Sequence, residues 1–306
     1  MSRVMLTGAT GFVGRSVLSA FLEAGDDVHA LTRRPAPPPL AGVTWHEADL
    51  MAGCELVGEV EPEILVHLAW YAEHAKFWSS IENVRWVEAS LRLLRAFAQA
   101  GGRRALVAGT CAEYEWGGEE DLQESRSRLG PLSLYGVCKD ALRRIAAAYA
   151  SEVELELAWG RLFFLYGPGE QPTRLVPAVI RALLAGESLA TTSGLQVRDF
   201  IHVHDAAAAL VALAHSDVSG PVNIASGHGV AVAELLETIE SLTGALHLID
   251  RGGRATPALE PPRIVADVGR LEREVGFHPA ISLGDGLAST IEWWRGRLHT
   301  ATPAGS

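Results

Sequence analysis

Two side chains capable of proton transfer stand four residues apart in the segment Tyr135-Gly136-Val137-Cys138-Lys139. At that spacing both project from one face of an α-helix, so the lysine ammonium can lie beside the phenol. A neighbouring positive charge favours the phenolate, and a tyrosine tuned in this way can act as a general acid or base near neutral pH. The spacing alone is common by chance, and it gains weight here because a nucleotide-binding pattern precedes it.

A glycine-rich turn near the N-terminus has the spacing of a dinucleotide-binding loop. Gly8, Gly11 and Gly14 stand at every third position between a predicted strand, 3–7, and a predicted helix, 12–24. The first glycine permits a tight turn, the second lets the backbone approach a pyrophosphate, and the third lets helix and strand pack closely. The helix N-terminus also offers free N–H groups to an anion. The alternative is a turn without a ligand, but its position favours a cofactor contacted by Gly8, Thr10, Gly11, Phe12, Val13 and Gly14.

The residues after the second predicted strand bear on which cofactor binds. An acidic side chain there would bind the adenosine ribose and favour NAD, but this chain has Thr32-Arg33-Arg34. Two guanidinium groups can hold a 2′-phosphate, so Arg33 and Arg34 favour NADP, with NAD as the alternative cofactor. Two solvated surface arginines are the competing explanation. Asp49 and Leu50, after the third predicted strand, either border the adenine or begin a helix.

Short apolar segments alternate with longer amphipathic ones along the first half of the chain. This alternation is typical of parallel strands with helices on both faces. We predict an α/β, Rossmann-like doubly wound parallel sheet, with residues 1–167 as the NAD(P)-binding domain and with returns to the sheet near 199–225. Residues 168–306 are predicted to be mainly a smaller, mixed α/β substrate-binding region. The predicted strands are 3–7, 27–31, 43–47, 64–68, 104–108, 155–159 and 222–224, the main helices are 12–24, 83–100, 133–150, 174–184, 205–215 and 233–243, and 193–203 is irregular or extended.

The composition excludes several other classes of protein. The chain has 306 residues and a net charge of −11, so it repels nucleic-acid backbones and we expect no nucleic-acid partner. No run of about 18 uncharged apolar residues occurs, so we expect no membrane span. Cys54, Cys111 and Cys138 fit no zinc pattern, and their odd number argues against a disulfide framework. We therefore predict a cytoplasmic protein with reduced thiols and without a metal site.

Taken together, four motifs resemble the extended short-chain dehydrogenases/reductases. They are the glycine loop, the strand end His67-Leu68-Ala69, Thr110, and the Tyr135–Lys139 segment. More narrowly, the chain resembles the branch of nucleotide-sugar epimerases, dehydratases and ketoreductases, and the resemblance covers nearly its whole length. Further matches to this branch are Asn83-Val84, Leu165-Tyr166-Gly167-Pro168-Gly169, the segment from Arg198 to Asp205, and Gly276-Phe277-His278-Pro279 with Trp293-Trp294.

The resemblance implies catalytic roles for three residues. Tyr135 would be the acid–base group, and Thr110 would hydrogen-bond the reacting sugar oxygen. Lys139 would bind the nicotinamide ribose and lower the pKa of the tyrosine. Leu68 and Ala69, at the end of a strand, would border the cofactor.

On the substrate side, the resemblance implies that Arg198 holds a diphosphate and that Arg263 shares this task. A structural ion pair of Arg198 with Asp199 or Asp205 is the alternative. Two further residues are assigned to the substrate, each with a purely structural role as the alternative: Trp70 and Asn83.

Departures from the branch narrow the predicted reaction. Its 4,6-dehydratases carry Asp-Glu directly after the threonine to eliminate water, whereas this chain has Cys111-Ala112, so dehydration is disfavoured. Its 4-epimerases usually hold NAD tightly through an acidic residue at the position of Thr32, and the arginines here suit a cofactor that exchanges at each turnover. We therefore predict an NAD(P)H-dependent ketoreductase acting on a nucleotide-diphospho-4-keto-deoxysugar. A nucleotide-sugar epimerase using NAD is the alternative, and a non-catalytic NADP-binding regulator is a third.

Relatives in this branch commonly dimerise through two helices, which here are 83–100 and 133–150. We therefore expect a homodimer, with Leu91, Leu94, Ile145 and Ala146 in its apolar face. The alternative is that these side chains face the protein's own sheet.

Overall fold

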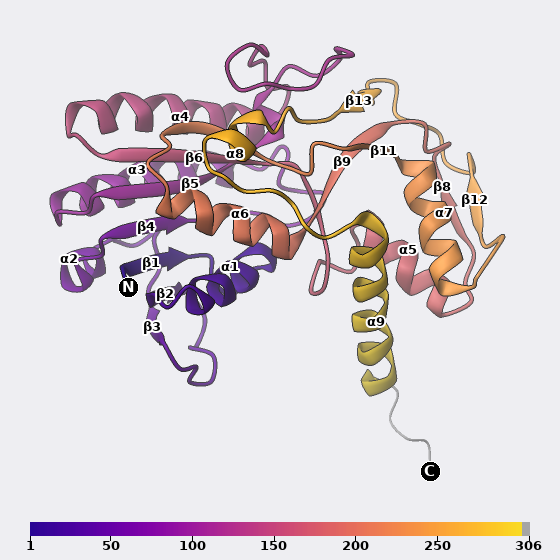
Figure 1. Cartoon of the computed structure of the whole chain (residues 1–306), viewed down its shortest axis with the longest axis horizontal. Helices are drawn as coiled ribbons and strands as arrows, with labels where there is room; N and C mark the ends of the chain where they lie inside the picture. Colours follow the sequence, from indigo (N-terminus) through magenta and orange to yellow (C-terminus); the bar gives the residue numbers. More distant parts are fainter. Residues whose placement is uncertain (302–306) are drawn as a thin grey trace.

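The computed structural model describes residues 1–301, in which seven parallel strands form the main sheet (Figure 1). The strand order is β10-β6-β5-β4-β1-β2-β3. The winding therefore reverses between β1 and β4, and open parallel sheets bind ligands beyond the carboxyl ends of the strands at such a reversal. The strands are β1 (Arg3–Thr7), β2 (Asp27–Thr32), β3 (Val43–Glu47), β4 (Ile64–His67), β5 (Arg104–Thr110), β6 (Glu156–Leu162) and β10 (Gly220–Ile224).

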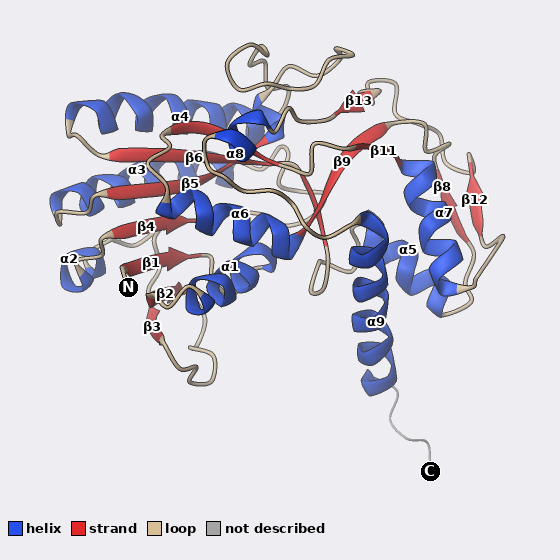
Figure 2. Ribbon diagram, viewed as in Figure 1, coloured by secondary structure: helices blue, strands red, loops and turns tan. Residues whose placement is uncertain are grey.

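Helices cover both faces of this sheet, as Figure 2 shows. Alternate side chains of β1 divide between two cores, since Val4 and Leu6 pack with α1 and α6, and Met5 packs with α3 and α4. All three side chains are fully buried, as expected for a parallel strand between two helix layers. The helices of the two layers are α1 (Phe12–Glu23) with α6 (Val203–His215), and α2 (Leu56–Val60) with α3 (Glu82–Gln99) and α4 (Leu134–Glu152).

A smaller region stands at one end of the main sheet (Figure 1). Its central strand, β9, pairs in parallel with β7 and β13 and antiparallel with β11. Three helices enclose a separate core there, with Val179, Leu235 and Leu287 fully buried. The elements are β7 (Phe164–Tyr166), β9 (Val197–His202), β11 (Gly229–Ala231) and β13 (Arg263–Ile264), the paired β8 (Leu189–Thr191) and β12 (Ile249–Arg251), and α5 (Leu175–Leu184), α7 (Val232–Thr243), α8 (Gly269–Arg273) and α9 (Leu283–Ala301).

The predicted fold class is confirmed, and the structure adds where the later segments belong. Residues 197–202 form β9 of the smaller sheet, whereas the return to the main sheet is made by β10, which pairs with β6. Helix α6 accompanies this return by packing on α1. The division of the chain at residue 167 stays a prediction. None of the helices described up to residue 301 is long and apolar enough to span a membrane.

Two of the four side chains predicted for a dimer interface face the protein's own sheet instead. Leu94 and Ala146 are each 1% exposed and belong to the core under α3 and α4. The prediction is wrong for these two because an apolar helical residue gives no sign of which surface it covers. Ile145, by contrast, is 49% exposed, and Leu91 is half-buried.

Candidate active site

The glycine loop between β1 and α1 leaves room for a ligand's phosphates. Gly8 has a φ of 75°, and a Cβ there would lie 2.8 Å from the backbone nitrogen of Ala69. A Cβ on Gly14 would lie 2.0 Å from the carbonyl oxygen of Gly8, so only glycine lets the helix approach the strand this closely. Gly11 precedes α1 without any side chain capping it, which leaves the first N–H groups of the helix to an anion.

A cavity of about 590 Å³ opens from this loop along the carboxyl edge of the sheet. It passes the ends of β1, β2, β4 and β5, which is the place that the strand order selects. Most of the residues predicted from the sequence meet here. Those that line the cavity are Gly8, Thr10, Gly11, Phe12, Val13, Gly14, Arg33, Arg34, Asp49, Leu50, Leu68, Ala69, Trp70, Thr110 and Tyr135.

The far end of the cavity fits the adenosine half of a dinucleotide. Arg33 and Arg34 follow β2 and are both exposed, and the buried Thr32 hydroxyl is bonded to the backbone of Arg34. Asp49 accepts a hydrogen bond from the backbone nitrogen of Met51, so its carboxylate shapes a turn beside the same cavity. The glycine cradle can bind the phosphates of a dinucleotide, and the two cations lie beside it.

Tyr135 is positioned by the start of α4. Ser133 caps this helix by accepting a hydrogen bond from the backbone nitrogen of Gly136 at 3.1 Å. A Cβ on Gly136 would lie 2.4 Å from the carbonyl oxygen of Ala112, so the glycine lets α4 touch the turn that carries Thr110. Tyr135 and Thr110 consequently line the cavity together, and the Thr110 side chain acts on the Tyr135 phenol.

Burial raises the pKa of the Tyr135 phenol, and the hydrogen bond with Thr110 acts in the opposite direction. The phenol is therefore protonated at neutral pH, as a general acid must be before it donates. The rings of Phe77 and Trp78 meet the Tyr135 ring edge to face, with centroids 4.9 and 5.8 Å away. These aromatic walls keep water from the phenol and were not predicted, because they belong to an irregular loop without a recognisable pattern.

Lys139 lies one turn after Tyr135 and is held beneath Trp70. Its Nζ donates to the carbonyl oxygen of Ala108 at 2.8 Å and lies 3.8 Å from the centre of the Trp70 ring. Burial lowers the Lys139 pKa to about 7, while the Glu113 carboxylate acts to raise it. Trp70 therefore contacts the lysine as well as the cavity, and its role is not limited to the sugar pocket.

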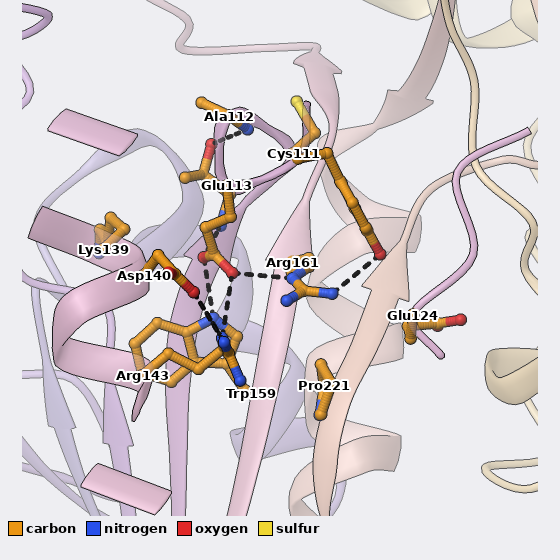
Figure 3. A network of polar contacts seen from close by, with 12 residues as sticks. Cys111, Ala112, Glu113, Glu124, Lys139, Asp140, Arg143, Trp159, Arg161 and Pro221 are labelled. Carbon is orange, nitrogen blue, oxygen red and sulfur yellow. Dashed lines mark hydrogen bonds and ion pairs between the residues drawn. The ribbon is translucent and has the colours of Figure 1, made fainter. Parts of the chain in front are cut away.

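A buried carboxylate, Glu113, organises the turn after β5 (Figure 3). Its oxygens accept hydrogen bonds from the backbone nitrogen of Thr110 at 2.9 Å, from Trp159 Nε1 at 2.9 Å and from Arg161 Nε at 2.8 Å. Glu113 and Arg161 are both fully buried. Because Glu113 is committed to these three donors, it is not free to protonate a leaving hydroxyl.

Cys111 follows Thr110 and borders the cavity, where a dehydratase of this branch would have an acid. Burial raises the pKa of its thiol to about 12, so the group is neither an acid nor a thiolate near neutral pH. The sulfur therefore contributes an apolar contact to the wall beside Thr110.

The two arginines predicted to hold the substrate diphosphate do not line the cavity. Arg198 is 4% exposed, forms an ion pair with Glu260 and donates to the carbonyl oxygen of Val197 at 2.8 Å. The ion-pair partner of Arg198 is therefore Glu260 and not Asp199 or Asp205, the two partners that the sequence had suggested. Arg263, on the neighbouring strand β13, pairs with Asp121 at 2.5 Å. Ion pairs within the protein therefore engage both guanidinium groups.

Asn83 has the structural role that was the alternative to a substrate contact. It is fully buried, and its amide donates to the carbonyl oxygens of Phe77 and Ser80 at 2.7 and 2.8 Å. Its oxygen accepts a hydrogen bond from Trp70 Nε1 at 2.8 Å. Asn83 thus fixes the loop that supplies the aromatic walls of the site.

The cavity wall also contains polar residues that were not predicted from the sequence, namely Glu170, Gln171 and Arg174. They follow the Leu165–Gly169 segment directly, and that position after a strand end was the available signal. No cluster of three or more potential metal ligands occurs in residues 1–301 as described.

Comparison with known proteins places this geometry in a family. A family model described as "NAD dependent epimerase/dehydratase family" matches residues 4–225. The dTDP-glucose 4,6-dehydratase of Streptomyces griseus is 27% identical, with 100% of this chain and 98% of that protein covered. The structure of MoeE5 in complex with UDP-glucuronic acid and NAD is 31% identical, with a TM-score of 0.84 and coverage of 96% and 99%.

A UDP-glucose 4-epimerase of Thermotoga maritima has the same fold, with a TM-score of 0.86 at 22% identity and coverage of 97% and 99%. The family match spans more than half of the chain and includes the glycine loop, Thr110, Tyr135 and Lys139. The protein is therefore an enzyme of the NAD-dependent epimerase/dehydratase family.

Proposed function

We propose that the protein is an NADPH-dependent ketoreductase of a nucleotide-diphospho-4-keto-deoxysugar. The observation that carries this proposal is the pair Arg33 and Arg34 lining the adenosine end of the cavity. No carboxylate ends β2, where Thr32 stands in its place. Guanidinium groups attract a 2′-phosphate, and a cofactor bound in this way can leave after each turnover.

The residues at the other end of the cavity can complete a carbonyl reduction. The glycine loop and Lys139 would hold the reduced nicotinamide cofactor, which would supply the hydride. Tyr135 donates its phenolic proton to the sugar carbonyl oxygen, and Thr110 hydrogen-bonds the same oxygen. The Lys139 ammonium stabilises the phenolate left behind.

A 4-epimerase that uses NAD is the second candidate, and one observation favours it. MoeE5, the 31% identical relative, is solved with NAD and UDP-glucuronic acid. An epimerase would use Thr110, Tyr135 and Lys139 for an oxidation followed by a reduction, so these residues are compatible with both reactions. Dehydration is disfavoured because Cys111 and Ala112 offer no acid and Glu113 is buried against Arg161.

Removing both arginines tests the cofactor part of the proposal. In Arg33→Ala/Arg34→Ala, we expect the affinity for NADPH to fall by roughly ten- to a hundredfold, because charge-assisted contacts to the 2′-phosphate are lost. Affinity for NADH should be unchanged in titrations that follow nicotinamide fluorescence. The exposed pair Arg126 and Arg128, changed to alanine, is the control.

The reaction itself separates the two candidates. The reductase should consume one NADPH per keto-sugar and should purify with little bound nucleotide. Tightly bound NAD, together with sugar interconversion in the absence of added cofactor, would show that the protein is an epimerase and would contradict the proposed reductase.

We also propose a homodimer through the open faces of α3 and α4. Ile145 is 49% exposed and lines a shallow hollow of α4 with Ala141 and Tyr149, which gives this face an apolar centre. Ile145→Glu is expected to shift the mass measured by light scattering from dimer to monomer. Leu195→Glu, at a more exposed leucine of the smaller region, should leave the dimer intact. A wild-type monomer at all concentrations would contradict the proposal.

A further inference from the structure

The cavity wall near α5 carries a carboxyl group that the proposed reaction does not use. Glu170 lies between β7 and α5, lines the cavity and is 4% exposed. Its Oε1 lies 3.0 Å from Nε of Arg174, whereas its Oε2 is buried without a hydrogen-bond partner. A buried polar atom without a partner is unfavourable, so a ligand that brings a donor to Oε2 gains binding free energy.

The pair of Glu170 and Arg174 stands at the reacting end of the cavity. Arg174 lines the same wall, and its charge acts on the phenol of Tyr135 and on His74. The other cations that line the cavity, Arg33 and Arg34, lie at the adenosine end. A carboxyl beside the reacting end is therefore near the place where the sugar of a nucleotide-sugar substrate would react.

We propose that Glu170, held in place by Arg174, is the residue that recognises the sugar, with its free Oε2 accepting a hydrogen bond from a sugar hydroxyl. The inference rests on the nucleotide-sugar part of the proposed function and adds the class of sugar. A carboxylate at this place attracts a hydroxyl donor and repels a second carboxylate. The site therefore selects neutral hexosyl groups over hexuronosyl groups.

Because Glu170 can be protonated, the affinity for the sugar should depend on pH. Burial raises the pKa of its carboxyl to about 8, and Arg174 acts to lower it. Among the residues described, Arg174 is the charged group whose field acts on Glu170. A ligand hydroxyl favours the ionised acceptor, so binding of a neutral sugar tightens as the pH rises through this range. A ligand carboxylate would show the opposite trend.

Calorimetric titration at pH 9, where Glu170 is ionised, tests the inference with UDP-glucose and UDP-glucuronic acid, with dTDP-glucose to vary the nucleobase and with NADP⁺ at saturation. We expect the wild type to bind UDP-glucose about tenfold or more tightly than UDP-glucuronic acid. Glu170→Gln removes the charge but keeps the volume, and it should lower this preference by about tenfold. Glu237→Gln, at an exposed glutamate of α7, is the matched control and should leave the preference unchanged.

A second variant separates recognition from folding. Arg174→Gln keeps the carboxyl and removes its counter-charge, so UDP-glucose should bind more weakly at pH 7 and recover as the pH rises. A variant that is weak at every pH would contradict a role for the Glu170 charge.

The remaining outcomes separate this inference from the proposed function. Preferred binding of UDP-glucuronic acid by the wild type, or an unchanged preference in Glu170→Gln, overturns the sugar assignment and leaves the reductase standing. Failure of the wild type to bind both UDP-glucose and dTDP-glucose while it binds NADP⁺ overturns the sugar assignment together with the nucleotide-sugar reaction.

Discussion

Tyr135→Phe is expected to lower turnover by at least roughly 10²-fold, the usual scale of general acid–base catalysis. The substitution removes the phenolic proton and keeps the ring that packs against Phe77 and Trp78. The variant should therefore fold normally and bind the cofactor with an affinity close to that of the wild type. Steady-state kinetics and a fluorescence titration of the cofactor measure the two effects separately.

A control on the same helix makes the result specific. Tyr149 lies on the surface of α4 away from the cavity, so Tyr149→Phe should leave turnover unchanged. Near-normal turnover in Tyr135→Phe would show that another group donates the proton. Loss of activity in both variants would indicate damage to α4 and not the loss of an acid.

Glu113→Gln is expected to destabilise the protein by about 3–5 kcal/mol, since it leaves the buried Arg161 without its counter-ion. The amide has nearly the same volume as the carboxylate, so packing changes little. Figure 3 shows the carboxylate between Arg161 and Arg143, the latter with its Nε 3.9 Å from Oε2. Urea unfolding followed by circular dichroism measures the free-energy difference.

The neighbouring Glu115 provides a matched control. It pairs with Arg128 at 3.4 Å, but both side chains are largely exposed. Glu115→Gln should therefore cost about 1 kcal/mol or less. The double variant Glu113→Gln/Arg161→Met should recover part of the loss, because it removes the unpaired buried charge. Equal effects of Glu113→Gln and Glu115→Gln would exclude a structural role for the buried pair.

The architecture of the cofactor half follows from patterns that are local in the sequence. Local patterns of apolar residues predict strands such as 3–7 and helices such as 12–24. The glycines between them are needed because a side chain there would clash with the neighbouring backbone. Tyr135 and Lys139 could be paired from the sequence because four residues always bring two side chains to one face of a helix. The motifs Gly8–Gly14, Thr110 and Tyr135–Lys139 were sufficient to identify the family.

Which charged side chains reach the cavity depends on contacts between distant parts of the chain. Arg198 was predicted to meet the substrate, but folding places Glu260, 62 residues later, against its guanidinium group. Leu94 and Ala146 were expected at a surface and are covered by the sheet, because the burial of a helical face depends on its packing partner.

Glu170 is the opposite case, a residue of the cavity wall that was not predicted from the sequence. Its position after the Leu165–Gly169 segment did not by itself mark it as a site residue, because its burial and its free oxygen arise only when the cavity wall has formed. Local geometry is encoded in contiguous residues, whereas ion pairs and cavity walls join residues that are distant in sequence. Such contacts form only when the whole chain has folded, because each depends on the placement of several elements at once.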